Sequence, residues 1–320
     1  MNKFSKSILK VARRMYPLNY SYDGQLDKEF SDRIVPEASE LIYRHIISEA
    51  PLMVSRFGSI ELNCIINYLD QKDRRLKYLH YIQNKTRYYE WDLRTLESMC
   101  TNAGFFPFSY NMLEEFCELM LEDMQYIDVL GSWLKEESRL ADRFSNVQKI
   151  GLLNLEPYNH NDPWSRGLEG KKVLVVHPFA HTIKEQYQKR KRLFVDNRVL
   201  PEFELKVIQA VQSIAGNKTV FDNWFEALNS MKEEIDKVDF EVAIIGCGAY
   251  GMPLAAHIKR MGKKAVHLGG ATQLLFGIKG KRWEEEYYDY KSRLFNENWT
   301  KPYEVDVPQN FLKVEDGCYW

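Results

Sequence analysis

Three short stretches of this chain carry residue types suited to chemistry, and the first is a glycine-rich turn. Residues 246–251 read Gly-Cys-Gly-Ala-Tyr-Gly, a G-x-G-x-x-G pattern between an apolar, β-rich run and an apolar segment that predicts a helix. A helix that begins after such a turn offers unpaired N–H groups and the positive end of its dipole to a phosphate. We interpret the turn as a diphosphate-binding loop. Its candidate contacts are Gly246, Gly248, Ala249, Tyr250 and Gly251.

The acidic residue of a redox dinucleotide site is missing beyond this turn. In NAD-binding folds, an Asp or Glu about 20 residues further on holds a ribose hydroxyl. Here the expected strand at 264–268 contains His267, and no Asp or Glu follows through Gln273. We therefore expect a nucleotide other than NAD, with His267 and Gln273 beside it. A turn that only packs a helix on a sheet is the structural alternative.

A second strand–glycine–helix unit carries an arginine and a carboxylate. The apolar run at 51–55 leads into Arg56-Phe57-Gly58, and Ser59-Ile60-Glu61 can begin the next helix. Ligands of open α/β sheets bind at the carboxyl ends of strands, where these residues are expected. Arg56 would stabilise a leaving phosphate, and Glu61 would act as a base or bind a divalent cation through its oxygens. Glu61 as a carboxylate that only complements the helix dipole is the alternative.

Two histidines follow a third expected strand, at 172–176. They lie in the stretch His177-Pro178-Phe179-Ala180-His181, whose spacing is not a standard zinc pattern. His177 or His181 is a candidate for activating an acceptor hydroxyl, and a satisfied structural histidine is the alternative. A basic helix is predicted to follow, through the run at 189–192, which either meets a phosphate or forms a solvated face.

The order of the remaining segments predicts the fold class. Strands that alternate with helices indicate a mainly parallel sheet with helices on both faces, a Rossmann-like α/β fold. Further strands are expected at 126–130, 149–155, 203–212 and 240–245, and helices at 36–45, 59–69, 111–123, 221–235 and 252–262. We expect a peripheral segment at 1–35, one α/β domain at 36–285 and a tail at 286–320 that wraps the core.

The composition indicates which kinds of partner and which cellular compartment to expect. The 320 residues carry a net charge of −1, so no global field would recruit nucleic acid. The five cysteines are scattered without C-x-x-C pairs, which suits a reducing cytosol. No apolar run approaches the roughly 18 residues that span a bilayer, so we expect a cytoplasmic protein.

The N-terminal 16 residues predict a basic amphipathic helix. Lysines and arginines alternate there with apolar residues, a pattern that can rest on an anionic membrane surface. The alternative is a helix that docks on its own domain through its apolar side.

The quoted residues resemble the GT-D glycosyltransferases, bacterial enzymes of surface glycan and adhesin glycosylation. The resemblance rests on Arg56-Phe57-Gly58-Ser59-Ile60-Glu61 and on the late segments 248–255 and 267–269, and it extends over about residues 50–285. Residues 246–283 also look like proteins encoded in polysaccharide-biosynthesis clusters. The resemblance implies a Rossmann-like sheet, a nucleotide-sugar donor and a D-x-E metal motif.

Two positions depart from the family pattern. Ser59 stands where the aspartate of the D-x-E motif would be, and His267 stands where an acidic residue would end the late strand. Either Glu61 binds Mn²⁺ or Mg²⁺ with another ligand such as His267, or this member needs no metal, or it has lost activity.

The sequence therefore predicts a cytoplasmic, membrane-associated glycosyltransferase of polysaccharide biosynthesis, a hexosyltransferase of the GT-D type. It would move a sugar from a nucleoside-diphosphate donor, held also by Gly58 and Ser59, to a glycan or lipid-linked acceptor. An NAD(P)-dependent oxidoreductase and a non-catalytic nucleotide-binding scaffold are the alternatives. The missing ribose acid counts against the first, and Ser59 favours the second.

Overall fold

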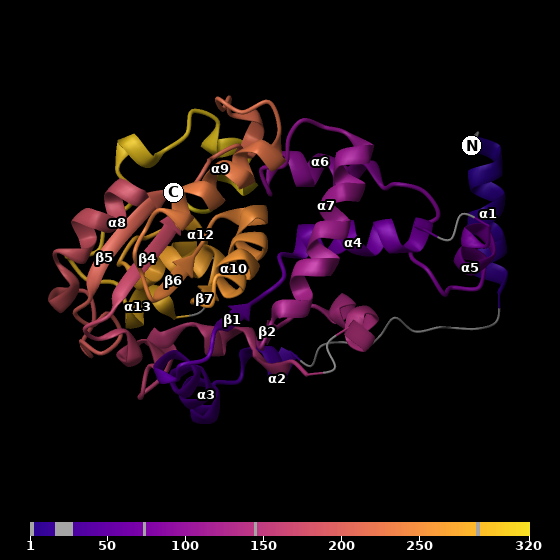
Figure 1. Cartoon of the computed structure of the whole chain (residues 1–320). Helices are drawn as coiled ribbons and strands as arrows, with labels where there is room; N and C mark the ends of the chain where they lie inside the picture. Colours follow the sequence, from indigo (N-terminus) through magenta and orange to yellow (C-terminus); the bar gives the residue numbers. More distant parts are fainter. Residues whose placement is uncertain (1–2, 17–27, 73–74, 144–145, 286–288) are drawn as a thin grey trace.

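The computed structural model describes residues 3–16, 28–72, 75–143, 146–285 and 289–320 (Figure 1). Within them, seven strands form one sheet in the order β3-β2-β1-β7-β6-β4-β5, and every neighbouring pair is parallel. The strands are β1 (Leu52–Ser55), β2 (Val129–Ser132), β3 (Gln148–Gly151), β4 (Lys172–His177), β5 (Glu204–Gln209), β6 (Val242–Ile245) and β7 (Lys264–His267). The predicted α/β class is confirmed.

Helices cover both faces of the sheet. One face is covered by α4 (Ser59–Lys72), α6 (Leu93–Thr101), α7 (Tyr110–Asp123), α9 (Trp224–Asp236) and α10 (Gly251–Arg260). The other is covered by α3 (Pro36–Ile47), α8 (Ala180–Tyr187), α11 (Thr272–Leu275) and the C-terminal segment. The remaining helices are α1 (Lys3–Met15), α2 (Lys28–Asp32), α5 (Lys77–Ile82), α12 (Lys281–Glu285) and α13 (Tyr290–Arg293).

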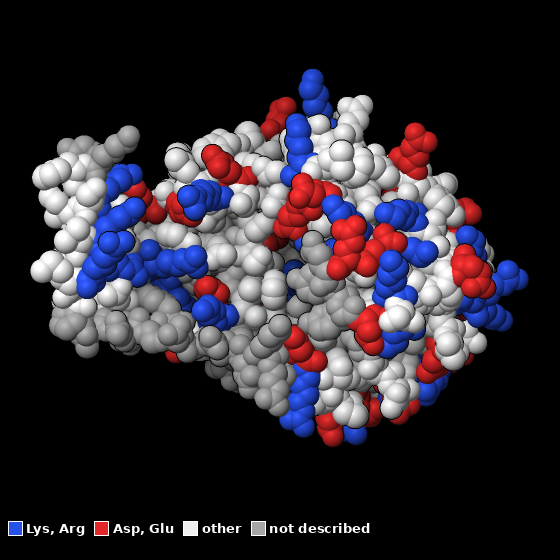
Figure 2. Space-filling view, turned by 180° about the vertical axis from the view of Figure 1, so that it is seen from behind, with Lys and Arg blue, Asp and Glu red and all other residues white. Residues whose placement is uncertain are grey.

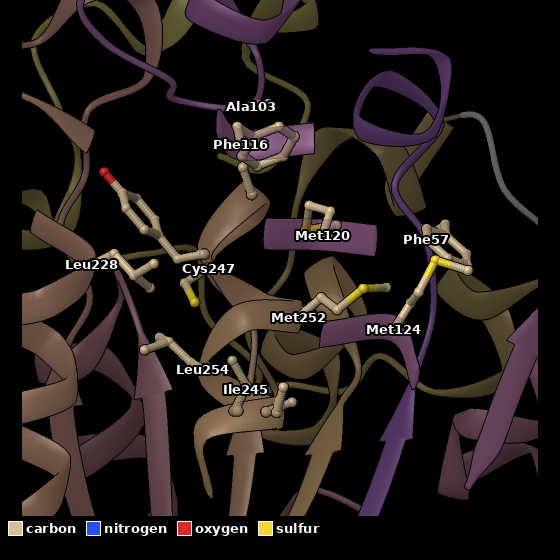
Figure 3. Packing of buried hydrophobic residues seen from close by; sticks show 14 of the residues in the cluster. Phe57, Ala103, Phe116, Met120, Met124, Leu228, Ile245, Cys247, Met252 and Leu254 are labelled. Atoms are coloured by element: carbon tan, nitrogen blue, oxygen red, sulfur yellow. The ribbon is translucent and has the colours of Figure 1, made fainter. Parts of the chain in front are cut away.

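The apolar strands alternate between two hydrophobic cores. Met53 of β1 belongs to the first core, whereas its neighbours Leu52 and Val54 belong to the second. Figure 3 shows the first core, where Phe116 of α7 and Leu254 of α10 pack above the sheet. A strand buried on both faces must be apolar throughout, which explains the continuous apolar runs in the sequence.

At two places in the sheet, the connections that follow two neighbouring strands pass to opposite faces of the sheet. The chain passes from β6 to α10 on one face, but from its neighbour β4 to α8 on the other. The adjacent strands β1 and β7 behave in the same way, leading to α4 and α11. Such switch points open a crevice at the carboxyl ends of the strands, because no connection fills the space between them.

Several of the predicted strand and helix boundaries were wrong. The strand expected at 126–130 is β2, because a 3₁₀ turn at Met124–Tyr126 delays its start. The strand expected at 149–155 ends at Gly151, where another 3₁₀ turn begins, and the strand expected at 203–212 is the shorter β5. The basic helix ends at Tyr187, and Arg190–Arg192 form a separate turn.

The C-terminal segment, residues 299–320, contacts α8 and the residues that follow β4. The carboxylate of Asp306 accepts hydrogen bonds from the backbone N–H and the hydroxyl of Thr182, at 2.7 and 2.6 Å. Trp320 packs its ring against Phe179, with 5.8 Å between centroids. These contacts place residues 306–320 beside the carboxyl ends of the central strands.

Among the described residues, no helix is both long and apolar enough to cross a bilayer.

Candidate functional site

A pocket of about 430 Å³ lies at the carboxyl ends of the central strands. Residues that follow β1, β2, β4, β6 and β7 line it, and the C-terminal segment supplies a further wall. It therefore occupies the crevice that the two switch points create.

Most of the predicted site residues meet in this pocket. It is lined by Arg56, Gly58, Ser59, Glu61, His177, Gly246, Gly248, Tyr250, His267 and Gln273. Ala249 and Gly251 belong to the same turn but do not line the cavity. His181 lies on the exposed side of α8, with its ring 5.9 Å from that of Tyr303. The structure therefore does not bring His181 to the other candidates.

Arg56 brings a positive charge without a paired carboxylate into the pocket. Among the described residues it forms no salt bridge, and its buried Nε has no hydrogen-bond partner. Burial lowers the pKa of Arg56, while the nearby charge of Glu61 acts in the opposite direction. Because a guanidinium stays charged in proteins and a buried unpaired charge is unfavourable, this arrangement favours an anionic ligand.

Trp133 supports the guanidinium of Arg56. The Arg56 Cζ lies 5.1 Å from the centroid of the Trp133 ring. The indole Nε1 donates to the carbonyl of Phe57 at 2.9 Å, and the Glu137 carboxylate accepts the Trp133 N–H at 3.1 Å. Sequence reasoning missed Trp133 because the expected strand ended at Leu130. An indole directly after a buried strand was the signal that could have found it.

The carboxylate of Glu61 is folded back over the start of its own helix. A Cβ built on Gly58 would lie 1.8 Å from Glu61 Oε2, so this glycine makes room for the carboxylate. Burial raises the pKa of Glu61, while a hydrogen bond from its own backbone N–H and the charge of Arg56 oppose the rise. The position suits a base with a raised pKa, and it also suits a carboxylate that caps the helix.

His267 explains the third glycine of the turn. A Cβ on Gly251 would lie 2.2 Å from His267 Nε2, so only glycine admits the imidazole against α10. His267 Nδ1 lies 3.1 Å from Ser55 Oγ. Burial, helped by the charge of Arg56, lowers the pKa of His267 to about 3, so the ring is neutral at neutral pH.

His177 is also a neutral, buried imidazole. Its Nδ1 accepts the backbone N–H of Phe179 at 3.0 Å, which leaves the hydrogen on Nε2. Burial lowers the pKa of His177 to about 3. In this tautomer Nε2 donates a hydrogen bond, so His177 is better suited to hold a ligand oxygen than to accept a proton.

The glycine turn uses several of its N–H groups within the protein. Gly246, Ala249 and Tyr250 donate to backbone carbonyls at 3.0, 3.4 and 3.3 Å. Within the described part of the chain, the N–H groups of Cys247 and Gly248 have no such backbone acceptor. Gly248 adopts a φ of 58°, which favours glycine. The turn therefore offers a ligand fewer donors than its sequence pattern predicts.

The C-terminal wall of the pocket has no counterpart in the sequence motifs. Arg282 forms an ion pair with Glu315 and donates to the hydroxyl of Tyr319 at 3.2 Å. Gln273 Nε2 donates to the carbonyl of Tyr319 at 3.2 Å, so it anchors this wall as well as lining the cavity. Sequence reasoning predicted Gln273 but missed Arg282, Glu315 and Tyr319, because no motif marks them.

The side chains present do not fit a protein-held divalent cation. Among the described residues, no group of three or more His, Cys, Asp or Glu side chains is placed to hold a metal ion. Ser59 occupies the aspartate position of the D-x-E motif, and Glu315 is paired with Arg282. Glu61 is thus the one carboxylate of the expected motif.

The contact between Gly251 and His267 predicts a coupled effect on stability. Gly251→Ala should lower the free energy of unfolding by about 1–3 kcal/mol, because the new methyl group overlaps the imidazole. In a His267→Ala background the same change should be neutral or stabilising, because Ala favours a helix and the clash is gone. Urea unfolding of the four proteins measures both values, and equal losses in the two backgrounds would contradict the contact.

The buried histidines predict a loss of stability in acid. Their pKa is about 3 in the folded protein and near 6.5 when unfolded, so the unfolded chain binds more protons between these values. Stability should therefore fall as pH drops from about 6.5, by up to about 1.4 kcal/mol per pH unit for each histidine.

His177→Asn should flatten this pH dependence, since the Asn oxygen can still accept the Phe179 N–H. Thermal unfolding between pH 7 and 4 checks the slope. The exposed His181→Asn variant is the control. If both variants keep the wild-type slope, the low pKa of His177 does not contribute to the pH dependence of stability.

Comparisons with known proteins give one structural similarity. No protein-family model matches the chain, and no curated protein matches it. One solved structure with similarity to it is described as "A New Glycosyltransferase (DUF1792) from Streptococcus sanguinis". The TM-score is 0.35 and the sequence identity 13%, over 85% of this chain and 95% of that chain.

Proposed function

We propose that the pocket binds a nucleoside-diphosphate sugar and that the protein is a glycosyltransferase of the hexosyltransferase class. The observation that carries the proposal is the cation of Arg56, which lines a pocket at a switch point and has no ion-pair partner among the described residues. The resemblance of residues 56–61 and 248–255 to GT-D enzymes points to the same ligand class. A diphosphate matches a guanidinium in charge and in hydrogen-bond geometry.

The proposed reaction assigns each polar side chain a role. The oxygen of an acceptor hydroxyl attacks the anomeric carbon while its proton passes to the Glu61 carboxylate. The bond between that carbon and the diphosphate oxygen breaks, and the nucleoside diphosphate leaves with the electron pair. Arg56 stabilises the charge that develops on the leaving group. The proposal also assigns hydrogen bonds to the oxygen atoms of the nucleotide sugar. They are donated by His177 Nε2–H and by the N–H groups of Cys247 and Gly248.

In this proposal Arg56 neutralises the charge of the diphosphate. The family resemblance gives this role to a metal ion bound by Glu61. The side chains around Glu61 do not supply a set of metal ligands, as described above. We therefore assign Glu61 as a base and expect donor binding that does not require Mn²⁺ or Mg²⁺.

The remaining parts of the proposal concern the acceptor and the organisation of the chain. The acceptor would be a glycan or a lipid-linked glycan of polysaccharide biosynthesis, at the cytoplasmic side of a membrane. Residues 36–285 would form the catalytic domain, residues 1–35 a peripheral segment, and the tail 286–320 would complete the pocket.

A nucleotide-binding scaffold is the second candidate. The back-folded Glu61, which can cap α4 without taking part in chemistry, favours it. Nothing in the pocket favours the oxidoreductase, because β7 ends in the neutral His267 where an acidic ribose ligand would lie.

Arg56 should determine nucleotide affinity. A thermal-shift panel of UDP-, GDP-, CMP- and dTDP-sugars and NAD(H), with Mn²⁺ or EDTA, should show stabilisation by one nucleotide-sugar class in both conditions. A ligand at 100 times its dissociation constant adds about 2.7 kcal/mol. Arg56→Ala should weaken binding by about 1.5–3 kcal/mol through loss of a charged hydrogen bond.

The matched control is Arg94→Ala, which removes an exposed arginine on α6. A shift seen with NAD(H) alone, or an Arg56→Ala protein that binds nucleotide sugars as well as the control, would overturn the proposal.

Glu61→Gln should separate the transferase from the scaffold. The amide keeps the shape and can still contact the helix start but cannot accept a proton, so turnover should fall about 10²–10⁴-fold while nucleotide affinity stays unchanged. Sugar release from the donor and the binding shift are measured on the same preparation. If wild type and variant bind the nucleotide equally and neither transfers sugar to any glycan or lipid-linked acceptor, the scaffold is the better account.

A further inference from the structure

The N-terminal helix α1 exposes its apolar side. Phe4, Ile8, Val11 and Met15 lie on one stripe of this helix, because their spacing of three and four residues matches the helical repeat. Their exposed fractions are 73%, 52%, 54% and 78%. The helix packs against α5 with Leu9 and Ala12 half-buried, but this stripe of four residues faces outward and is not used for docking.

Polar contacts fix this orientation. Arg13 Nε donates to Asn84 Oδ1 at 2.6 Å, and its guanidinium lies 4.3 Å from the ring centroid of Tyr81. Lys6 forms an ion pair with Glu90. The basic side chains of α1 attach it to α5 and the following segment, while the apolar stripe stays exposed. Figure 1 shows α1 beside α5 at one end of the molecule.

Basic residues border the exposed stripe. Lys10 and Arg14 are exposed on α1, whose sequence contains no Asp or Glu. The adjacent start of α5 adds exposed Leu76 and Leu79, at 45% and 47%. Figure 2 shows Lys and Arg side chains gathered at this end of the molecule, beside uncharged described residues at its outer edge.

We propose that α1 binds in the plane of an anionic membrane. Phe4, Ile8, Val11 and Met15 enter the boundary between headgroups and acyl chains, and Lys10 and Arg14 contact lipid phosphates. A helix of 13 residues is about 20 Å long, too short to cross a hydrocarbon core of about 30 Å, so it lies along the surface.

The charges favour a lipid surface over a second copy of the chain. Two copies that met through this stripe would bring Lys10 and Arg14 of each against the same basic side chains of the other. Like charges at an interface oppose association, whereas anionic headgroups complement them. This inference is independent of the chemistry assigned to the pocket, and it suits an acceptor that is carried on a lipid.

Vesicle co-sedimentation of the full chain tests the apolar part of the proposal. The protein should bind vesicles that contain phosphatidylglycerol and bind pure phosphatidylcholine at least tenfold more weakly. The double variant Ile8→Glu, Val11→Glu should lose at least tenfold in binding to the anionic vesicles. Both positions are exposed, so circular dichroism and melting temperature should match wild type. The matched control is Val195→Glu, whose valine is 107% exposed beyond α8.

The charge part is tested with Lys10→Gln and Arg14→Gln. Each should weaken binding about fivefold, the value expected for one basic residue at an anionic surface. Lys191→Gln, at the opposite end of the molecule, should have no effect. Absence of binding to anionic vesicles, or binding that the stripe variants leave unchanged, would overturn the proposal. The proposal would also be overturned if the wild-type protein did not bind vesicles but formed a dimer that the double variant Ile8→Glu, Val11→Glu dissociates.

Discussion

The structure depends on close packing where β4, β6 and β7 end. A Cβ on Gly246 would lie 2.5 Å from both the Gly269 carbonyl oxygen and Thr272 Oγ1, and one on Gly251 would overlap His267. These glycines let the strand ends approach one another, which brings His177 and His267 into contact with the pocket. A pattern typical of phosphate binding therefore has a packing explanation at two of its three glycines, and ligand binding depends on other groups as well.

Burial at this edge determines the charge of the site. Both histidines are kept neutral, because the surrounding protein disfavours their protonated forms. Arg56 keeps its charge in the same surroundings, supported by Trp133, and no carboxylate of the described residues forms an ion pair with it. Neutral donors beside a cation that has no ion-pair partner among the described residues are complementary to an anion. Glu61 is the nearby carboxylate whose raised pKa suits it to accept a proton.

The sequence predicted the parts of the site that depend on local patterns. The strand–glycine–helix units at 51–61 and 240–262 have clear apolar runs and turn residues, so Arg56, Glu61 and the glycine turn were placed at strand ends before the fold was known. Trp133 was missed because a 3₁₀ turn delays the start of β2, which ends at Ser132, two residues later than expected. Glu315 and Tyr319 reach the pocket from the tail and Arg282 from α12, and such long-range contacts leave no periodic signal in the chain. The orientation of α1 depended on side-chain contacts, which its amphipathic pattern could not specify.

The central claim is that a cation held by the protein recognises the diphosphate of a donor. Calorimetric titration of EDTA-treated protein with a nucleoside diphosphate and with the matching nucleoside tests it most directly. The account predicts that the diphosphate binds at least tenfold more tightly than the nucleoside, and that Arg56→Ala removes the difference. Equal affinities for the two ligands, or a preference that Arg56→Ala leaves intact, would contradict it.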